Sequence, residues 1–117
     1  MSGDILVYDE TYHLIDLIKK YCGRKIDVTF CSDRKELDSM TFCDYDLVYL
    51  NTSKLSDSDL IYRMSSQVNK VYINSTSSVF MNRFIFIENV FFFDSNNYRD
   101  KLFIIDQIYS KVIGFDN

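Results

Sequence analysis

The sequence predicts one α/β domain over residues 1–117, a doubly wound (βα)5 sandwich of three layers around a parallel sheet of order 2-1-3-4-5. The first observation is that short apolar runs alternate with stretches whose apolar residues recur at helical spacing. The second is the length of 117 residues, which suits a single core. Short parallel strands need right-handed helical crossovers, and five such units are accommodated most simply in this strand order.

The first half of the chain predicts two strands and two helices. Residues 5–8 are an apolar run that reads as a buried strand, and residues 14–22 carry apolar side chains at helical spacing. Gly23 is a natural helix stop. Residues 26–30 alternate as a second strand, and the polar stretch 32–40 predicts a short helix. This half therefore supplies two βα units.

The middle of the chain predicts the third βα unit and the strand after it. Residues 47–50 are the clearest buried strand. Ser56 followed by Asp59 resembles a capping box at the start of a helix that runs to Val68. Residues 71–73 then predict a fourth strand.

The last third contains one ambiguous stretch and two clear elements. Within residues 76–89, the segment 79–81 suggests helix and the segment 84–87 suggests strand, and the sequence leaves both open. Residues 90–93 predict the fifth strand, and a final helix follows it. The apolar face expected to pack on the sheet is Leu102, Ile105, Tyr109, Val112 and Ile113.

Composition excludes several classes of protein. Apolar residues make up 47% of the chain, which excludes intrinsic disorder, and the net charge of −4 argues against nucleic-acid binding. No apolar run approaches the roughly 20 residues of a membrane span. The first residues lack the basic region of a signal peptide, and the three cysteines show no metal or disulfide spacing. We therefore expect a cytoplasmic protein with small core cysteines and no membrane partner.

Polar residues stand where the predicted strands end, at the edge where doubly wound sheets place their sites. They are Asp9, Glu10, Asn51, Ser75 and Ser95. An adjacent acid pair after a strand suits Mg²⁺, which prefers oxygen ligands. Alternatively, one of the acids caps the following helix. The sequence leaves both interpretations open.

Two of these strand ends resemble the receiver domains of two-component response regulators. Residues 5–10 (ILVYDE) are similar to the family's first strand with its acidic pair, and residues 46–51 (DLVYLN) look like the strand that carries the phosphoacceptor. The order of these motifs, with βα alternation between and after them, covers nearly the whole chain. The resemblance implies a flavodoxin-like or CheY-like fold.

The resemblance also implies that the phosphorylation chemistry is lost. Asp9 and Glu10 fall on the family's metal-binding acids, but Asn51 stands where the family has the phosphoacceptor aspartate, and Ser95 stands where it has a lysine. An amide is a poor nucleophile for acyl phosphate formation, and a serine cannot neutralise a phosphoryl group. The resemblance therefore implies a degenerate phosphorylation site and an atypical receiver, or pseudo-receiver.

Other residues of the resemblance concern signalling. Ser75 falls on the family's switch serine or threonine, and Phe92 near its switch aromatic. Phe103, Ile104 and Ile108 widen the apolar stripe of the last helix beyond the usual width, which predicts an interface there. In receivers the face near this helix commonly mediates dimerisation.

The predicted function is a non-enzymatic, phosphorylation-independent signalling or protein–protein interaction module. Its partner is a second protein or a second copy that docks through the last helix, and no cofactor is expected beyond a weak Mg²⁺ site. The alternative is a metal-dependent enzyme or small-molecule binder that uses Asp9 and Glu10, with Asp94 as a further ligand. The only histidine, His13, lies away from any plausible nucleophile.

Overall fold

The fold is described by a computed structural model that covers residues 5–22, 28–52 and 54–113. The strands are β1 (Ile5–Tyr8), β2 (Val28–Cys31), β3 (Leu47–Asn51), β4 (Lys70–Asn74) and β5 (Val90–Phe93). The helices are α1 (His13–Cys22), α2 (Arg34–Asp38), α3 (Ser58–Ser65), α4 (Ser78–Asn82) and α5 (Tyr98–Ile113), with short 3₁₀ turns at Phe42–Asp44 and Leu55–Asp57. All strand pairs are parallel, in the order β2-β1-β3-β4-β5. The predicted doubly wound topology, that of flavodoxin-like and CheY-like folds, is confirmed.

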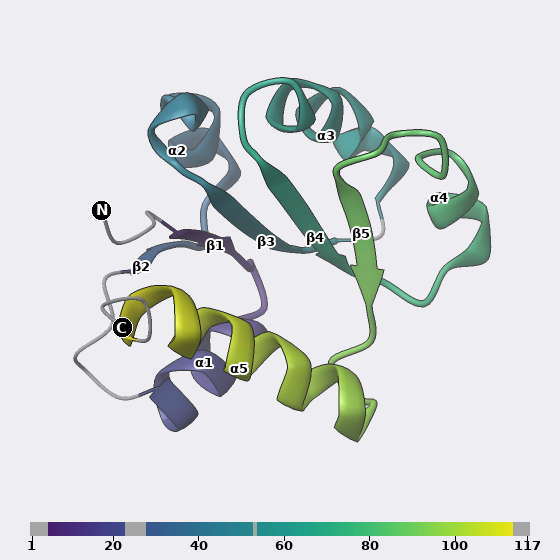
Figure 1. The fold of residues 1–117 in the computed structure, drawn as a ribbon. Coiled ribbons are helices and arrows are strands. Elements are labelled where there is room, and N and C mark those ends of the chain that lie inside the picture. Colours follow the sequence, from purple (N-terminus) through teal and green to yellow (C-terminus); the bar gives the residue numbers. More distant parts are fainter. Residues whose placement is uncertain (1–4, 23–27, 53, 114–117) are drawn as a thin grey trace.

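Helices cover both faces of the sheet and make three layers (Figure 1). Helices α1 and α5 lie on one face, and α2, α3 and α4 lie on the other. Strands β1 and β3 are covered by helices on both faces, and their residues are accordingly almost all apolar, as expected for parallel strands under crossover helices. Each face therefore has its own core.

The register of the strands sets the position of the candidate site. Tyr8 lies opposite both Cys31 and Leu50, and Asn51 lies opposite Asn74. The carboxyl ends of β1, β3 and β4 therefore meet along one edge of the sheet, and Asn74 in turn lies opposite Phe93 of β5. Residues that follow these strands are brought together by the topology alone.

Several predicted element boundaries differ from the observed ones. The second predicted strand, residues 26–30, is observed from Val28 to Cys31, while its first two residues and Gly23 lie outside the described residues. The predicted capping box is wrong, because the 3₁₀ turn at residues 55–57 precedes α3 and places Asp57 before the helix. The Asp57 carboxylate instead contacts Arg34 and accepts a hydrogen bond from Thr52, so it serves tertiary packing.

The ambiguous stretch 76–89 contains a short helix and no strand. Helix α4 begins after Ser77, whose hydroxyl accepts a hydrogen bond from the Phe80 backbone amide at 3.3 Å. Phe84 is fully buried, but Ile85 and Phe86 lie in turns and are largely exposed. The apolar run at 84–87 therefore had the composition of a strand without a neighbouring strand to pair with.

The buried face of the last helix only partly matches the predicted one: Ile105 packs against the core as predicted, and the side chains of Tyr109, Val112 and Ile113 lie outside the described residues. Ile104 and Ile108 are fully buried against the sheet, so their assignment to an exposed interface is wrong. Leu102, expected to face the sheet, is 45% exposed. Successive residues of a helix are about 100° apart around its axis. A small error in the predicted rotation of the helix about that axis therefore changes which side chains face the sheet. Phe103 is exposed, as an interface residue must be.

The two cysteines whose side chains are described lie in different environments. Cys31 is a buried core residue, and burial raises the pKa of its thiol to about 11. Cys43 is exposed, so the prediction that it is a core residue is wrong, and the side chain of Cys22 lies outside the described part.

Among the described helices, none has the length and apolar character needed to cross a bilayer.

Candidate functional site

The candidate site is a chain of hydrogen-bonded polar side chains along the carboxyl edge of the sheet. It runs from Asp9 after β1, through Asn51 at the end of β3 and Asn74 at the end of β4, to Ser95 after β5. We call these four residues the strand-end network. Asp9, Asn51 and Ser95 were predicted as site residues. Asn51 bonds to Asp9 directly, and Asn74 links Asn51 to Ser95.

Both carboxylate oxygens of Asp9 already accept hydrogen bonds from within the protein. Its Oδ1 accepts hydrogen bonds from the Thr11 amide at 3.0 Å and the Thr11 hydroxyl at 2.7 Å, and from the Asn51 side-chain amide at 2.9 Å. Its Oδ2 accepts from the backbone amides of Leu14 at 2.5 Å and Ile15 at 3.4 Å. These last two amides belong to the first turn of α1, so Asp9 caps that helix.

The environment of Asp9 favours its charged form. Burial of this side chain, which is 0% exposed, raises the pKa of the carboxyl. Hydrogen bonds from the Thr11 and Asn51 side chains and from the Leu14 and Thr11 amides together outweigh burial, and the net pKa lies below the usual value. Asp9 is therefore a buried anion that is held by donors from strand β3, from helix α1 and from Thr11 in the turn between β1 and α1.

Glu10 turns to different partners. Its carboxylate accepts a hydrogen bond from the Tyr8 hydroxyl at 2.5 Å and forms an ion pair with Lys54 at 2.9 Å. These two contacts lower the pKa of Glu10. Both members of the ion pair are substantially exposed, with side-chain exposures of 39% for Glu10 and 64% for Lys54. The acid pair that suggested Mg²⁺ is thus divided between a helix cap and a surface ion pair.

No cluster of metal-binding side chains gathers at this edge. Across residues 5–22, 28–52 and 54–113, no group of three or more His, Cys, Asp or Glu side chains is placed to hold a metal ion. Asp94, the third ligand of the alternative prediction, accepts a hydrogen bond from the Asn96 amide beyond β5. The weak Mg²⁺ site at Asp9 and Glu10 stays a prediction, and a cation there would have to compete with the hydrogen bonds and the ion pair that these two carboxylates already make.

Asn51 uses both ends of its amide. The Nδ2 group donates to Asp9 at 2.9 Å and to the Thr11 hydroxyl at 3.1 Å, while Oδ1 accepts from Asn74 at 3.0 Å. A carboxylate at position 51 would have no hydrogen to give to Asp9 at neutral pH. The amide therefore fits this position better than the acid of a phosphorylatable receiver would.

Asn74 is the site residue that sequence reasoning missed. Its Nδ2 donates to Asn51 and to the Ser95 hydroxyl at 2.9 Å, and its Oδ1 accepts from the Ser95 backbone amide at 2.9 Å. The fourth strand was predicted to end at residue 73, which placed Asn74 in a loop. Extending β4 by one residue would have set Asn74 opposite Asn51, as observed.

The two predicted switch residues lie beside the network. The Ser75 hydroxyl accepts a hydrogen bond from the Ser77 amide at 3.2 Å, and the Ser75 amide donates to the Phe93 carbonyl at 3.1 Å. Phe92 is half-buried and packs edge-to-face on Phe80, with ring centroids 6.4 Å apart. Ser75 and Phe92 both line one pocket, and their switch roles stay predictions.

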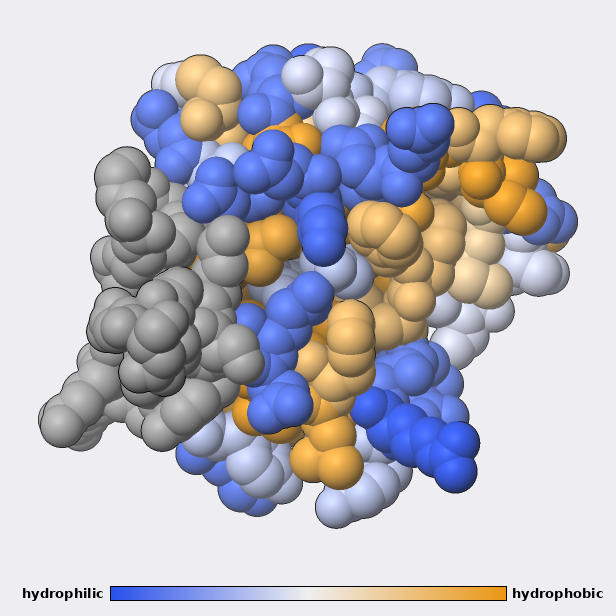
Figure 2. Space-filling model, in the orientation of Figure 1, coloured by the Kyte–Doolittle hydropathy of each residue, from blue (hydrophilic) through white to orange (hydrophobic). Residues whose placement is uncertain are grey.

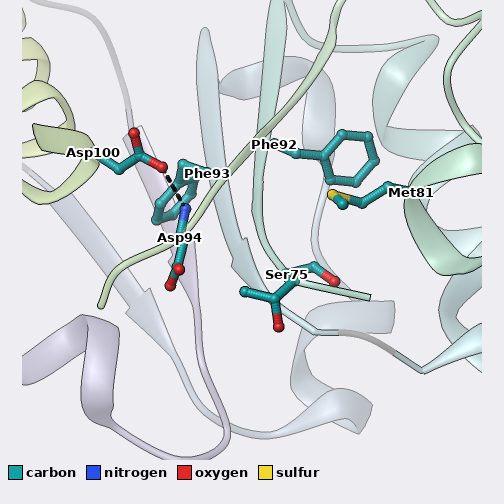
Figure 3. A pocket seen from close by; sticks show the side chains of 7 residues that line it. Ser75, Met81, Phe92, Phe93, Asp94 and Asp100 are labelled. Carbon is teal, nitrogen blue, oxygen red and sulfur yellow. Dashed lines mark hydrogen bonds between the residues drawn. The ribbon is translucent and has the colours of Figure 1, made fainter. Parts of the chain in front are cut away.

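That pocket is an open cavity of about 330 Å³ between β4, β5, α4 and α5. Figure 3 shows Phe92 and Met81 on one side and Asp94 and Asp100 on the other, with Ser75 between them. The Asp94 backbone amide donates to the Asp100 carboxylate at 2.8 Å, which fixes the start of α5 against the end of β5. One wall of the cavity is thus apolar, and the other combines the two acids with the ring of Phe93.

A band of exposed apolar side chains crosses the outer edge of β5. In Figure 2 it runs from the upper right, over α4 and the loop after it, across β5 and down to α5. We call it the β5 face, and its members are Ile85, Phe86, Phe91, Leu102 and Phe103, which are 65%, 92%, 40%, 45% and 53% exposed. Contiguous apolar surface of this kind marks contact sites.

An aromatic ladder supports the centre of the β5 face. Tyr72 stacks on Phe91 with ring centroids 5.2 Å apart, and it meets Phe103 edge-to-face at 6.2 Å. On its other side Tyr72 stacks on Tyr49, and the hydroxyls of both tyrosines bond to Gln107 of α5. The exposed rings of Phe91 and Phe103 therefore both pack on the buried ring of Tyr72.

The chemical capacity of the strand-end network is limited to hydrogen bonding. It contains one carboxylate, fully occupied, two amides and one hydroxyl, and none of these is an activated nucleophile. The exposed ammonium of Lys54 is engaged by Glu10.

Comparison with models of protein families, with curated proteins and with solved structures found no match for the chain.

Proposed function

We propose that this domain is a protein–protein interaction module of pseudo-receiver type, which signals without phosphorylation. One observation carries the proposal: the amide of Asn51, at the position of the phosphoacceptor, is hydrogen-bonded at both ends within the strand-end network. Phosphoryl transfer needs a nucleophilic oxygen at the mouth of that strand, and an amide does not supply one.

Charge at the site supports the same proposal. Phosphoryl transfer depends mainly on a metal ion and on positive groups that stabilise the transferred phosphoryl. Ser95 is neutral and bonds to Asn74, and the nearby Lys54 is held by Glu10. The metal-dependent alternative has less support, because the carboxylate of Asp9 already accepts five hydrogen bonds within the protein.

The β5 face supplies the surface for docking. Taking about 200 Å² for each aromatic side chain and somewhat less for Leu and Ile, its members expose roughly 600 Å² together. Standard interfaces bury roughly 800 Å² on each partner, so the face can form the apolar centre of one. Exposed aromatic residues are the type most often found at such centres.

Acetyl phosphate with Mg²⁺ tests the loss of phosphorylation. We expect intact-mass measurement to find no phospho-adduct on the protein, because Asn51 lacks a nucleophilic oxygen. Any adduct would contradict the proposal, and peptide mapping of it to Asp94 would identify a different acceptor. A phosphorylatable receiver treated in the same tube serves as the positive control for the reagent.

Solution assembly tests the docking surface. We expect light scattering to show a dimer that forms with rising concentration, and we expect the double variant Phe91→Ser/Phe103→Ser to stay monomeric. Tyr98→Ser is the matched control, because Tyr98 is an even more exposed aromatic residue, at 71%, and lies outside the defined face. A protein that stays monomeric at high concentration would exclude self-association, and equal loss in the control would contradict the assignment of the face.

A further inference from the structure

We propose that the pocket between β4, β5 and α5 binds a cation carried on an alkyl stem, and that the carrier is a lysine or arginine side chain of the docked partner. The carrier's identity rests on the proposed docking function. The pocket itself is argued from its lining, its charge and its place beside the β5 face.

The two walls of the pocket match the two parts of such a side chain. Phe92 and Met81 form an apolar wall against which a hydrocarbon stem can lie. The carboxylates of Asp94 and Asp100 stand on the opposite side, where the cationic head would end. The volume of about 330 Å³ lies at the lower end of the range for ligand pockets, which suits a single side chain.

The acidic wall is not neutralised by the protein. In the part of the chain that the structure describes, the four ion pairs involve Arg34, Arg63 and Lys54 as cations, and none includes Asp94 or Asp100. Each of these two carboxylates accepts one backbone hydrogen bond, from Asn96 and from Asp94 respectively, through a single oxygen. The second oxygen of each remains available to a donor.

The hydroxyl edge of the pocket adds selectivity for a cation. Thr76 is exposed beside the buried Ser75, and both line the cavity. Hydroxyl oxygens accept hydrogen bonds from ammonium and guanidinium groups. An anion would meet two carboxylates here, so phosphate and other acids are excluded by charge.

Position links the pocket to the docking surface. Phe91 and Phe92 are neighbours in β5 and face opposite sides of the sheet, with Phe91 on Tyr72 and Phe92 on Phe80. Because β5 is the edge strand, a partner segment that continues from the β5 face around this edge reaches the pocket. A basic residue flanked by apolar ones is the pattern that satisfies both surfaces at once.

Capped amino acids test the pocket without any partner. We would titrate the ¹⁵N-labelled chain with N-acetyl-lysine methylamide, with the arginine analogue and with the neutral norleucine analogue. We expect saturable amide shifts at Ser75, Thr76 and Asp94 with the two cations, and about tenfold weaker binding of norleucine. Equal binding of norleucine, or shifts with none of the probes, would overturn the proposal.

Variants of the acidic wall test its charge. We expect Asp94→Asn and Asp100→Asn each to weaken lysine binding by about tenfold, and both keep an oxygen that can accept the backbone hydrogen bond they make. Asp106→Asn, at an exposed position further along α5, is the matched control and should leave binding unchanged. An equal affinity in all three variants would overturn the assigned role of the carboxylates.

A capped peptide with one lysine between leucines tests the carrier. We expect it to bind at least tenfold tighter than capped lysine and to shift Phe91 and Phe103 as well, because it covers the β5 face. Equal affinities would overturn the partner assignment and leave a pocket for a free alkylammonium ion. A phospho-adduct in the separate acetyl phosphate experiment would refute the proposed function without changing these titrations.

Discussion

The strand-end network lies along the carboxyl edge of the sheet and the β5 face lies along its outer β5 edge, and the two regions differ in what they leave free to bind. In the network, Asp9, Asn51 and Asn74 use their polar atoms on one another and on neighbouring backbone. On the β5 face, Phe86 and Phe103 remain largely exposed to water. Polar groups that are already bonded have little left for a ligand, whereas exposed apolar area gains from contact. The comparison indicates a structural role for the first region and supports the docking role that we propose for the second.

The largest expected effect separates the two adjacent acids. Asp9→Ala should destabilise the fold by about 3 kcal/mol, because it leaves buried donors of α1 and Asn51 without their acceptor. Glu10→Ala is the matched control and should cost less than about 1 kcal/mol, since it removes an exposed ion pair. Urea denaturation at neutral pH measures both. Equal losses would show that Asp9 has no special structural role.

The next effect restores the receiver-type acid. Asn51→Asp should destabilise the metal-free protein by about 1–3 kcal/mol, because it places a second carboxylate against Asp9 and removes a donor. Asn51→Leu is the control, which loses the hydrogen bonds without adding charge. Mg²⁺ should recover stability in Asn51→Asp alone, as a third acid completes an oxygen site beside Glu10. Recovery of the leucine variant by Mg²⁺ would contradict this reading of the site.

The pH dependence of stability sharpens the role of Asp9. Its pKa in the folded protein lies below the unfolded value, so its contribution is complete above about pH 4 and is lost as the pH falls through the folded pKa. The difference in unfolding free energy between wild type and Asp9→Ala should therefore be constant near neutral pH and shrink on acidification. Urea titrations at a series of pH values provide the measurement. A gap that widens at low pH would mean that the folded pKa is raised.

The smallest expected effect on stability concerns the β5 face. Phe86→Ser should change the unfolding free energy by less than about 0.5 kcal/mol, because the side chain is 92% exposed. Phe84→Ser, two residues earlier and fully buried, should cost about 3 kcal/mol or more. Thermal unfolding compares the two variants directly. A large loss in Phe86→Ser would show that this ring packs on the domain and is not available for docking.

Most of the fold could be predicted from the sequence, because buried parallel strands are continuous apolar runs. Residues 5–8, 47–50 and 90–93 each had this pattern, and each is a strand at those positions or one residue longer. The strand order followed from the number of βα units. The segment 84–87 had the same composition and is not a strand, since strand formation depends on a pairing partner as well as on local preference.

The site was predicted less completely, because its contacts depend on register and on helix rotation. Asp9 and Asn51 were found from their places after predicted strands, but Asn74 was missed when β4 was ended one residue early. In α5 the rotation of the helix was predicted only in part, because Ile105 packs against the core as expected but Ile104 and Ile108 are buried and Leu102 is exposed. Errors of one residue matter little to topology and much to which side chains meet.

The most direct test of the central claim is the side-chain amide signal of Asn51 in the NMR spectrum of the labelled protein. We predict that this signal and that of Asn74 stay unchanged when Mg²⁺ and acetyl phosphate are added together, because both amides remain bonded within the network. A saturable shift or loss of the Asn51 signal, with a phospho-adduct in the mass spectrum, would contradict the account.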